Sequence, residues 1–278
     1  MALPLPAPLR LLQADLPACP QALLDLQALM HDDDSALPAI AALIESDMAL
    51  AAAVVRTVNS AMYGLLRRVE TVGEALRYLG TREVIAISYA SALRSAFPSS
   101  PRMNALWEAA GQTGLLMGRS ARALGMDPLQ AHTAGLFARS GLAVMLAHLG
   151  TPHAALVDRW SHDPVALDAA ETRTWGIGHA AYGSVLCASW GLAAPVVSFV
   201  RERTRPPEQR AGLDPRLRRL LALGSAAEAL LHAAAGGSAT LTGLAGDDAL
   251  PEPELRAAIA PHWHPLRELR ARGLQIID

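Results

Sequence analysis

Apolar residues in this chain recur at the three- and four-residue spacing of an amphipathic helix, and no useful stretch alternates like a half-buried strand. Leu23, Leu26 and Met30 share one such face, and Ile40 and Ile44 share the next. Aromatic residues make up only 4% of a chain that is 51% apolar, so alanine, leucine and valine must fill the interior. Such side chains suit helices that pack closely together. The sequence therefore predicts an all-α protein.

Proline and glycine divide the helical pattern into units. Residues 1–20 are rich in proline, which predicts an irregular lead-in. The stretch Pro98–Pro101 is the clearest internal linker, and it separates a predicted N-terminal bundle over 21–97 from a second helical unit over 103–207. Residues 131–149 are the most apolar part of that unit, so we expect one continuous helix there at its buried centre.

The remaining residues, 208–278, form a predicted C-terminal helical extension. We expect a long helix over 215–235 and a short last helix near 265–272. The leucines of the extension predict either packing on the second unit or a dimer contact, so a homodimer stays open. These leucines are Leu217, Leu220, Leu221, Leu223 and Leu230.

Charge and cysteine usage exclude several classes of protein. The formal net charge is −2, and the 24 basic residues are all arginines scattered along the chain, which argues against nucleic acid as a partner. Cys19 and Cys187 lie far apart and offer neither a metal pair nor a disulfide framework. No secretory signal pattern opens the chain, and no uncharged run reaches the roughly 18 residues that span a bilayer. We therefore expect a cytoplasmic protein without a membrane partner.

Several segments arrive in an order that resembles a known family. The segments are Ile44–Leu50, Val58–Gly64, Val72, Ala75, Leu79–Gly80, Ala134–Leu136, Glu171, Gly178–Gly183 and Trp190–Leu192. Over roughly residues 10–207 this set resembles the HDOD family, bacterial output domains related to the HD phosphohydrolases. The resemblance implies an N-terminal helical bundle packed on a modified HD-domain-like bundle, together spanning 21–207. It also implies a role in bacterial signal transduction, often alongside receiver or cyclic-dinucleotide modules.

The same resemblance argues against a working hydrolase. HD hydrolases hold divalent metals with His and Asp side chains that converge on the ion. Here Ala138 and Arg139 stand where the pivotal His–Asp pair is expected, and the flanking His positions fall near Ala109 and near Arg203–Thr204. Alanine cannot ligate a metal, and an arginine cation repels one. Only His179 remains, so we expect no metal, no cofactor and no catalytic residue.

Two readings of this region stay open. In the first, His179 hydrogen-bonds at the start of its helix, and Glu171 contacts it from the preceding helix. In the second, Arg139, Glu171, His179 and Arg203 line a vestigial cleft that binds a nucleotide or cyclic dinucleotide, because arginines pair bidentately with phosphate.

Asn59 and Ser60 lie at a predicted helix end, where short polar side chains cap free backbone groups. If the domain recognises a partner, the corner formed by Asn59, Ser60 and Tyr63 is the candidate surface. The leading hypothesis is a non-catalytic signalling scaffold that binds signalling proteins. Nucleotide sensing is the alternative, and a metal-dependent phosphohydrolase is the least favoured function.

Overall fold

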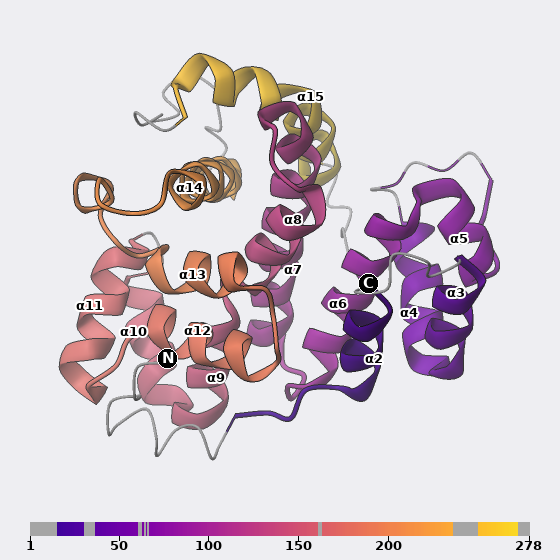
Figure 1. Cartoon of the computed structure of the whole chain (residues 1–278). Helices are drawn as coiled ribbons and strands as arrows, with labels where there is room; N and C mark the ends of the chain where they lie inside the picture. The colour runs from indigo at the N-terminus through magenta and orange to yellow at the C-terminus, as the bar shows by residue number, and fades with distance from the viewer. Residues whose placement is uncertain are drawn as a thin grey trace.

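The structure is a computed structural model that describes residues 16–30, 37–60, 63, 65, 67–160, 163–235 and 250–271. Every regular element in these residues is a helix, which confirms the predicted all-α class (Figure 1). Most of the predicted lead-in, 1–20, lies outside the described residues. In Figure 1, helices α2–α5 gather on one side and α9–α13 on the other, with α6–α8 between them.

The N-terminal bundle begins at residue 21. Its helices are α2 (Gln21–Met30), α3 (Leu37–Ser46), α4 (Met48–Val58), α5 (Val72–Leu79) and α6 (Thr81–Ser95). Asp47 sets the start of α4, because its Oδ1 accepts hydrogen bonds from the backbone N–H groups of Ala49 and Leu50 at 3.0 and 3.1 Å. Gly80, at a φ of 81°, makes the sharp turn from α5 into α6.

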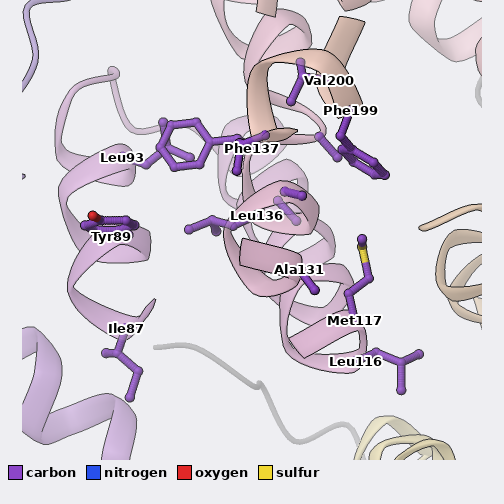
Figure 2. Packing of buried hydrophobic residues seen from close by; sticks show 14 of the residues in the cluster. Ile87, Tyr89, Leu93, Leu116, Met117, Ala131, Leu136, Phe137, Phe199 and Val200 are labelled. Atoms are coloured by element: carbon purple, nitrogen blue, oxygen red, sulfur yellow. The ribbon is translucent and has the colours of Figure 1, made fainter. Parts of the chain in front are cut away.

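The second bundle follows Ser100, whose hydroxyl accepts from the Met103 N–H and caps α7. Its elements are α7 (Pro101–Ala121), η1 (Arg122–Leu124), α8 (Pro128–Phe137), α9 (Ser140–Leu149), α10 (Thr151–Arg159), α11 (Pro164–Trp175), α12 (His179–Ser189), α13 (Ala194–Glu202) and η2 (Pro207–Gln209). Figure 2 shows α8 lying between Leu93 of α6 on one side and Phe199 of α13 on the other. Helix α8 therefore joins the two bundles through one hydrophobic core.

The single helix predicted over 131–149 is wrong, because the chain breaks into α8 and α9 at residues 138–139. Arg139 leaves helical geometry there, with φ −103° and ψ 6°. Beyond the break, Gly141 approaches α12 so closely that a Cβ on it would lie 1.9 Å from the His179 carbonyl oxygen. The apolar composition of this segment correctly predicted that it is buried. The close approach of Gly141 to α12 explains why the chain changes direction between α8 and α9.

The C-terminal extension packs on the second bundle. Helix α14 (Pro215–Ala235) lies against α7 and α13, and α15 (Glu252–Ala271) lies against α7. Four of the five predicted leucines are buried there, and Leu217 is half-buried. The structure therefore has these leucines in intramolecular packing. The last helix begins thirteen residues earlier than the predicted short helix at 265–272, because Leu255, Ile259 and Trp263 form a buried stripe that the sequence reading missed.

No single helix in the described ranges is long and apolar enough to cross a bilayer. Helices α3 and α4 meet the length and composition criteria only when taken together, and they are bent by 115°.

The most extensive contact between helices of the described residues joins α7 and α8. A Cβ placed on Gly135 would lie 2.7 Å from the Gly114 Cα and 2.8 Å from its backbone nitrogen. Real Cβ atoms do not approach backbone atoms so closely, so the two helices touch backbone to backbone at this point. Any side chain at residue 135 would push α8 away from α7.

We therefore expect Gly135→Ala to lower the free energy of unfolding by about 1–3 kcal/mol, the usual cost of overpacking a core. Chemical denaturation of the purified chain measures this. Gly73→Ala is the matched control, because its new Cβ would meet only the Thr71 Oγ1 at 3.9 Å. That variant should be neutral or slightly more stable. Equal stability of Gly135→Ala and the wild type would contradict the backbone contact.

Candidate functional site

A cavity of about 240 Å³ opens between α7, α9, α11 and the end of α13. Its lining includes Ala109, Arg139, His179 and Arg203. These are positions that the sequence resemblance aligned with the metal ligands of HD hydrolases. The fold thus brings together residues that lie up to 94 positions apart in the chain, and three of the four predicted cleft residues line the cavity. The fourth, Glu171, contacts His179 directly.

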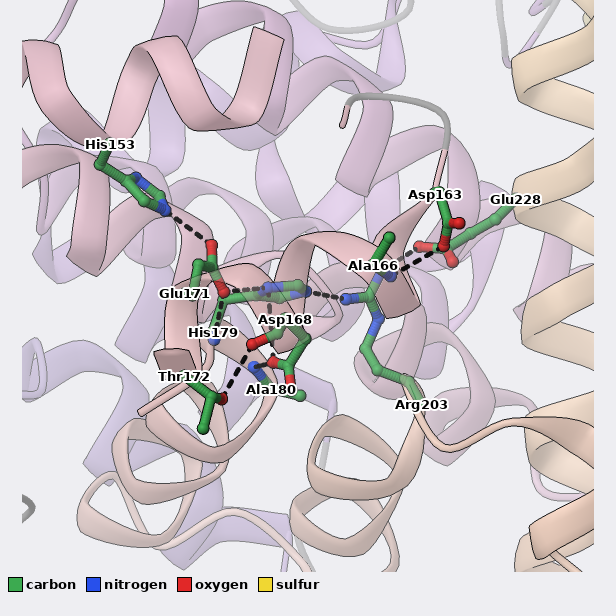
Figure 3. Close-up of polar contacts among 10 residues, drawn as sticks. All are labelled: His153, Asp163, Ala166, Asp168, Glu171, Thr172, His179, Ala180, Arg203 and Glu228. Atoms are coloured by element: carbon green, nitrogen blue, oxygen red, sulfur yellow. Dashed lines mark hydrogen bonds and ion pairs between the residues drawn. The ribbon is translucent and has the colours of Figure 1, made fainter. Parts of the chain in front are cut away.

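Both ring nitrogens of His179 are engaged (Figure 3). Nδ1 lies 2.6 Å from Glu171 Oε2, and Nε2 lies 2.9 Å from Arg203 Nη1. A guanidinium can only donate, so Nε2 must accept. The proton of the neutral ring is therefore on Nδ1 and points at Glu171. This agrees with the predicted role of His179 as a hydrogen-bonding residue at the start of α12.

Glu171 is fully buried and accepts three hydrogen bonds. Oε2 accepts from the backbone N–H and Nδ1 of His179, and Oε1 accepts from His153 Nε2 at 2.7 Å. Burial raises the pKa of this carboxyl, but the hydrogen bonds from His153 and His179 outweigh burial and lower its pKa from 4.5 to about 2. Glu171 is therefore an ionised anchor that orients two imidazoles.

The polar chain continues to the C-terminal extension. Arg203 Nη2 donates to Glu228 Oε1 of α14 at 2.8 Å, and Arg139 Nη2 lies 3.4 Å from the same oxygen. Burial raises the pKa of Glu228, yet the two guanidinium groups outweigh it and lower the pKa below its usual value. One carboxylate thus contacts both arginines of the predicted cleft, Arg139 and Arg203.

Three acidic and histidine side chains lie close enough together to be considered as ligands of a divalent metal. Asp168, Glu171 and His179 offer ligand atoms within 4.8 Å of one another. However, Asp168 Oδ1 already accepts from the Ala180 N–H at 2.9 Å, and Glu171 accepts three bonds. His179 has no lone pair free, because Arg203 holds Nε2 and Nδ1 carries the proton. The arrangement does not fit a hydrolytic metal centre, which requires ligand lone pairs directed at the ion and an open position for water.

The predicted partner corner lies in the N-terminal bundle, away from this cavity. Asn59 ends α4 and clamps the following loop: its side-chain nitrogen donates to the carbonyls of Val55 and Val69, and its Oδ1 accepts from the Val69 N–H. The Tyr63 hydroxyl donates to Glu83 at 3.0 Å, and Ser60 Oγ is buried with no described partner. These contacts give Asn59 a structural role, and the partner-binding role of the corner stays a prediction.

Sequence reasoning missed three members of the site: His153, Asp168 and Glu228. Glu228 carried a readable signal, because it is the one acidic residue in the Ala/Leu-rich α14. A lone carboxylate in an apolar helix needs a buried cation nearby. His153 and Asp168 carried no such signal, because surface helices commonly hold residues of these types.

The HDOD domain profile matches residues 16–206. The chain belongs to the HDOD family. A curated relative from Treponema pallidum (strain Nichols), named only as an uncharacterized protein, is 28% identical over 190 residues. That match covers 67% of this chain and 37% of the relative, so the HDOD chain spans little more than a third of that protein.

Solved structures share the fold. A candidate phosphohydrolase from Shewanella amazonensis SB2B has a TM-score of 0.73 and 22% identity, covering 94% of this chain and 97% of that one. An HDOD domain protein from Geobacter sulfurreducens has a TM-score of 0.72 and 18% identity, with coverage of 97% and 94%. A candidate signal transduction protein from Marinobacter aquaeolei VT8 has a TM-score of 0.70 and 21% identity, with coverage of 93% and 59%. At these identities the likeness establishes the HDOD fold.

We expect Glu171→Gln to lower the free energy of unfolding at pH 7 by about 3 kcal/mol, from the depressed pKa of the carboxyl. Because the folded pKa lies below the unfolded one, this stabilisation is complete above about pH 4.5 and is lost as the pH falls towards 2. Denaturant titrations at several pH values measure the free energy of unfolding of both proteins. The difference in this free energy between the wild type and the variant should become smaller in acid. Exposed Glu45→Gln is the control. A pH-independent gap would contradict the assignment.

Proposed function

We propose that this HDOD domain is a non-catalytic signal-transduction module that acts by binding another protein. The observation that carries the proposal is that both ring nitrogens of His179 are already hydrogen-bonded within the protein. Arg203 donates to one nitrogen and Glu171 accepts from the other, so this imidazole has no free nitrogen for a metal or a proton transfer. The methyl group of Ala138 adds no ligand.

The polar chain itself supports a structural role. It runs from His153 through Glu171, His179 and Arg203 to Glu228, and so ties α10, α11, α12 and α14 together (Figure 3). Buried charges are retained where they are paired, and breaking one pair leaves an uncompensated charge. A network of this kind holds a surface in one shape, which suits a domain that presents that surface to a partner.

The N-terminal bundle is the favoured partner surface. The large hydrophobic side chains that are exposed among the described residues all belong to α2–α5: Leu24, Leu37, Met48 and Tyr78. Met48 is 84% exposed and Tyr78 is 57% exposed. Single exposed apolar residues are ordinary, but their restriction to one bundle favours it as a contact region. A bacterial, cytoplasmic setting without nucleic-acid or membrane partners remains part of the proposal.

Met48→Glu and Tyr78→Glu should remove the contact with the signalling partner, because a charge would be buried in an apolar interface. Affinity capture of the tagged chain from its native cells, with quantitative mass spectrometry, measures the loss. Ala147→Glu on α9 is the control, since Ala147 is exposed on the other bundle. Proteins captured by the wild type and the control but not by the variants support the proposal. Equal capture by all four chains would place the contact elsewhere.

Nucleotide sensing is the second candidate function. The observation that favours it is that Arg102, Arg139 and Arg203 all line the His179 cavity. Against it, Glu228 already accepts from Arg203 and faces Arg139, so an anion would have to displace a carboxylate. The cavity, at about 240 Å³, also lies below the roughly 300–1,000 Å³ of most ligand sites.

We expect neither divalent metals nor nucleotides, including cyclic dinucleotides, to raise the melting temperature of the wild type. A ligand that binds only the folded state must raise it. Glu228→Gln frees the two guanidinium groups and is the variant in which a phosphate-dependent shift should appear. A wild-type shift that Arg139→Ala abolishes would establish sensing instead. Metal-dependent hydrolysis of a phosphate ester by the wild type would overturn the non-catalytic proposal.

A further inference from the structure

A second cavity, of about 360 Å³, lies between the two bundles and shares no lining residue with the His179 cavity. Helices α4 and α6 form its walls with small and aliphatic residues such as Leu50, Ala53 and Ala90, and Leu115 of α7 closes another side. Its volume falls within the range of small-molecule sites. Neither the HDOD resemblance nor the proposed function assigns it a role.

His132 of α8 is a buried polar residue in the lining of this cavity. It is 6% exposed, and no hydrogen bond is described for its ring. Gly114 and Gly118 of α7 crowd one side of the ring, where added Cβ atoms would lie 3.2 and 3.3 Å away. Burial, the largest influence, lowers the pKa of His132; Glu83 opposes this and Arg119 adds to it. A neutral imidazole therefore offers one donor and one acceptor to an occupant.

One exposed cation in the lining, Arg56, favours an anion. The other charged lining residues are Arg94, which already has an interaction partner, and Asp47. Asp47 Oδ1 already accepts two backbone N–H groups at the start of α4. Arg56 is exposed on the same helix and makes no ion pair with a described residue. Its guanidinium is thus available at the rim to a carboxylate.

The side chains that line the cavity favour an aliphatic ligand over one with a planar aromatic ring, such as a nucleobase. Tyr63 is the aromatic residue among those that line the cavity, and it is already engaged. Its hydroxyl donates to Glu83, and the Arg119 guanidinium lies 5.5 Å from the centre of its ring. The remaining apolar lining is alanine, glycine, leucine, isoleucine and proline, which offers no stacking surface.

We propose that this cavity binds a small aliphatic carboxylate, with its chain against Ala53, Ala90 and Leu115 and its carboxylate on Arg56. The charge-assisted bond to Arg56 sets the preference for an acid over an alcohol of the same length.

Isothermal titration calorimetry with octanoate and with 1-octanol tests the proposal on the full chain. We expect octanoate to bind the wild type and octanol to bind at least about tenfold more weakly, the size of one hydrogen bond to a charged group. Arg56→Gln should weaken octanoate about tenfold and leave octanol unchanged. Ala53→Phe fills the cavity and should abolish the binding of both.

Ala52→Phe is the control for Ala53→Phe, because Ala52 is on the same helix and does not line the cavity. It should bind octanoate like the wild type, and thermal melts verify that all variants fold. Absence of octanoate binding to the folded wild type would overturn the proposal. Octanoate binding that persists in Ala53→Phe would also overturn it. If the wild type bound octanol as tightly as octanoate, the proposed preference for a carboxylate at Arg56 would be wrong.

Discussion

The backbone contact of Gly114 with Gly135 fixes how α7 and α8 cross, and much of the molecule is arranged around this pair. Helices α14 and α15 also pack against α7, and helices α6 and α13 pack against α8. Because neither glycine has a side chain, the helices meet at their backbones. This proximity keeps the break after α8 beside α7, so that Arg139 faces the cavity lined by Ala109.

Electrostatics at the His179 cavity follow from that arrangement. A buried carboxylate, Glu171, orients two imidazoles, and a partly buried one, Glu228, contacts two guanidinium groups. These charged groups tolerate burial because each has a partner of opposite sign or a hydrogen bond. Arg203 occupies the second ring nitrogen of His179 and pairs with Glu228 through its other terminal nitrogen.

The C-terminal extension is part of this site although it lies beyond the residues that the HDOD profile matches, 16–206. Glu228 comes from α14, and the same helix covers α7 and α13 with buried leucines. The extension therefore completes the core of the HDOD bundle and supplies the carboxylate that pairs with Arg203. A chain ending at residue 206 would leave Arg203 without its carboxylate.

Local chemistry determined much of this protein directly from the sequence. Helical periodicity acts over a few residues, so the helix class was readable from the sequence. The Asp47 cap and the turn at Gly80 are likewise local, because each depends on residues close together in the chain. The HDOD resemblance also rested on short segments that are legible in the sequence, and the domain profile confirms it over residues 16–206. Only the tertiary structure decided the α8–α9 break, the length of α15 and the pairing of Glu228 with Arg203. These features depend on contacts between residues far apart in the chain, and spacing along a sequence carries no record of such distances.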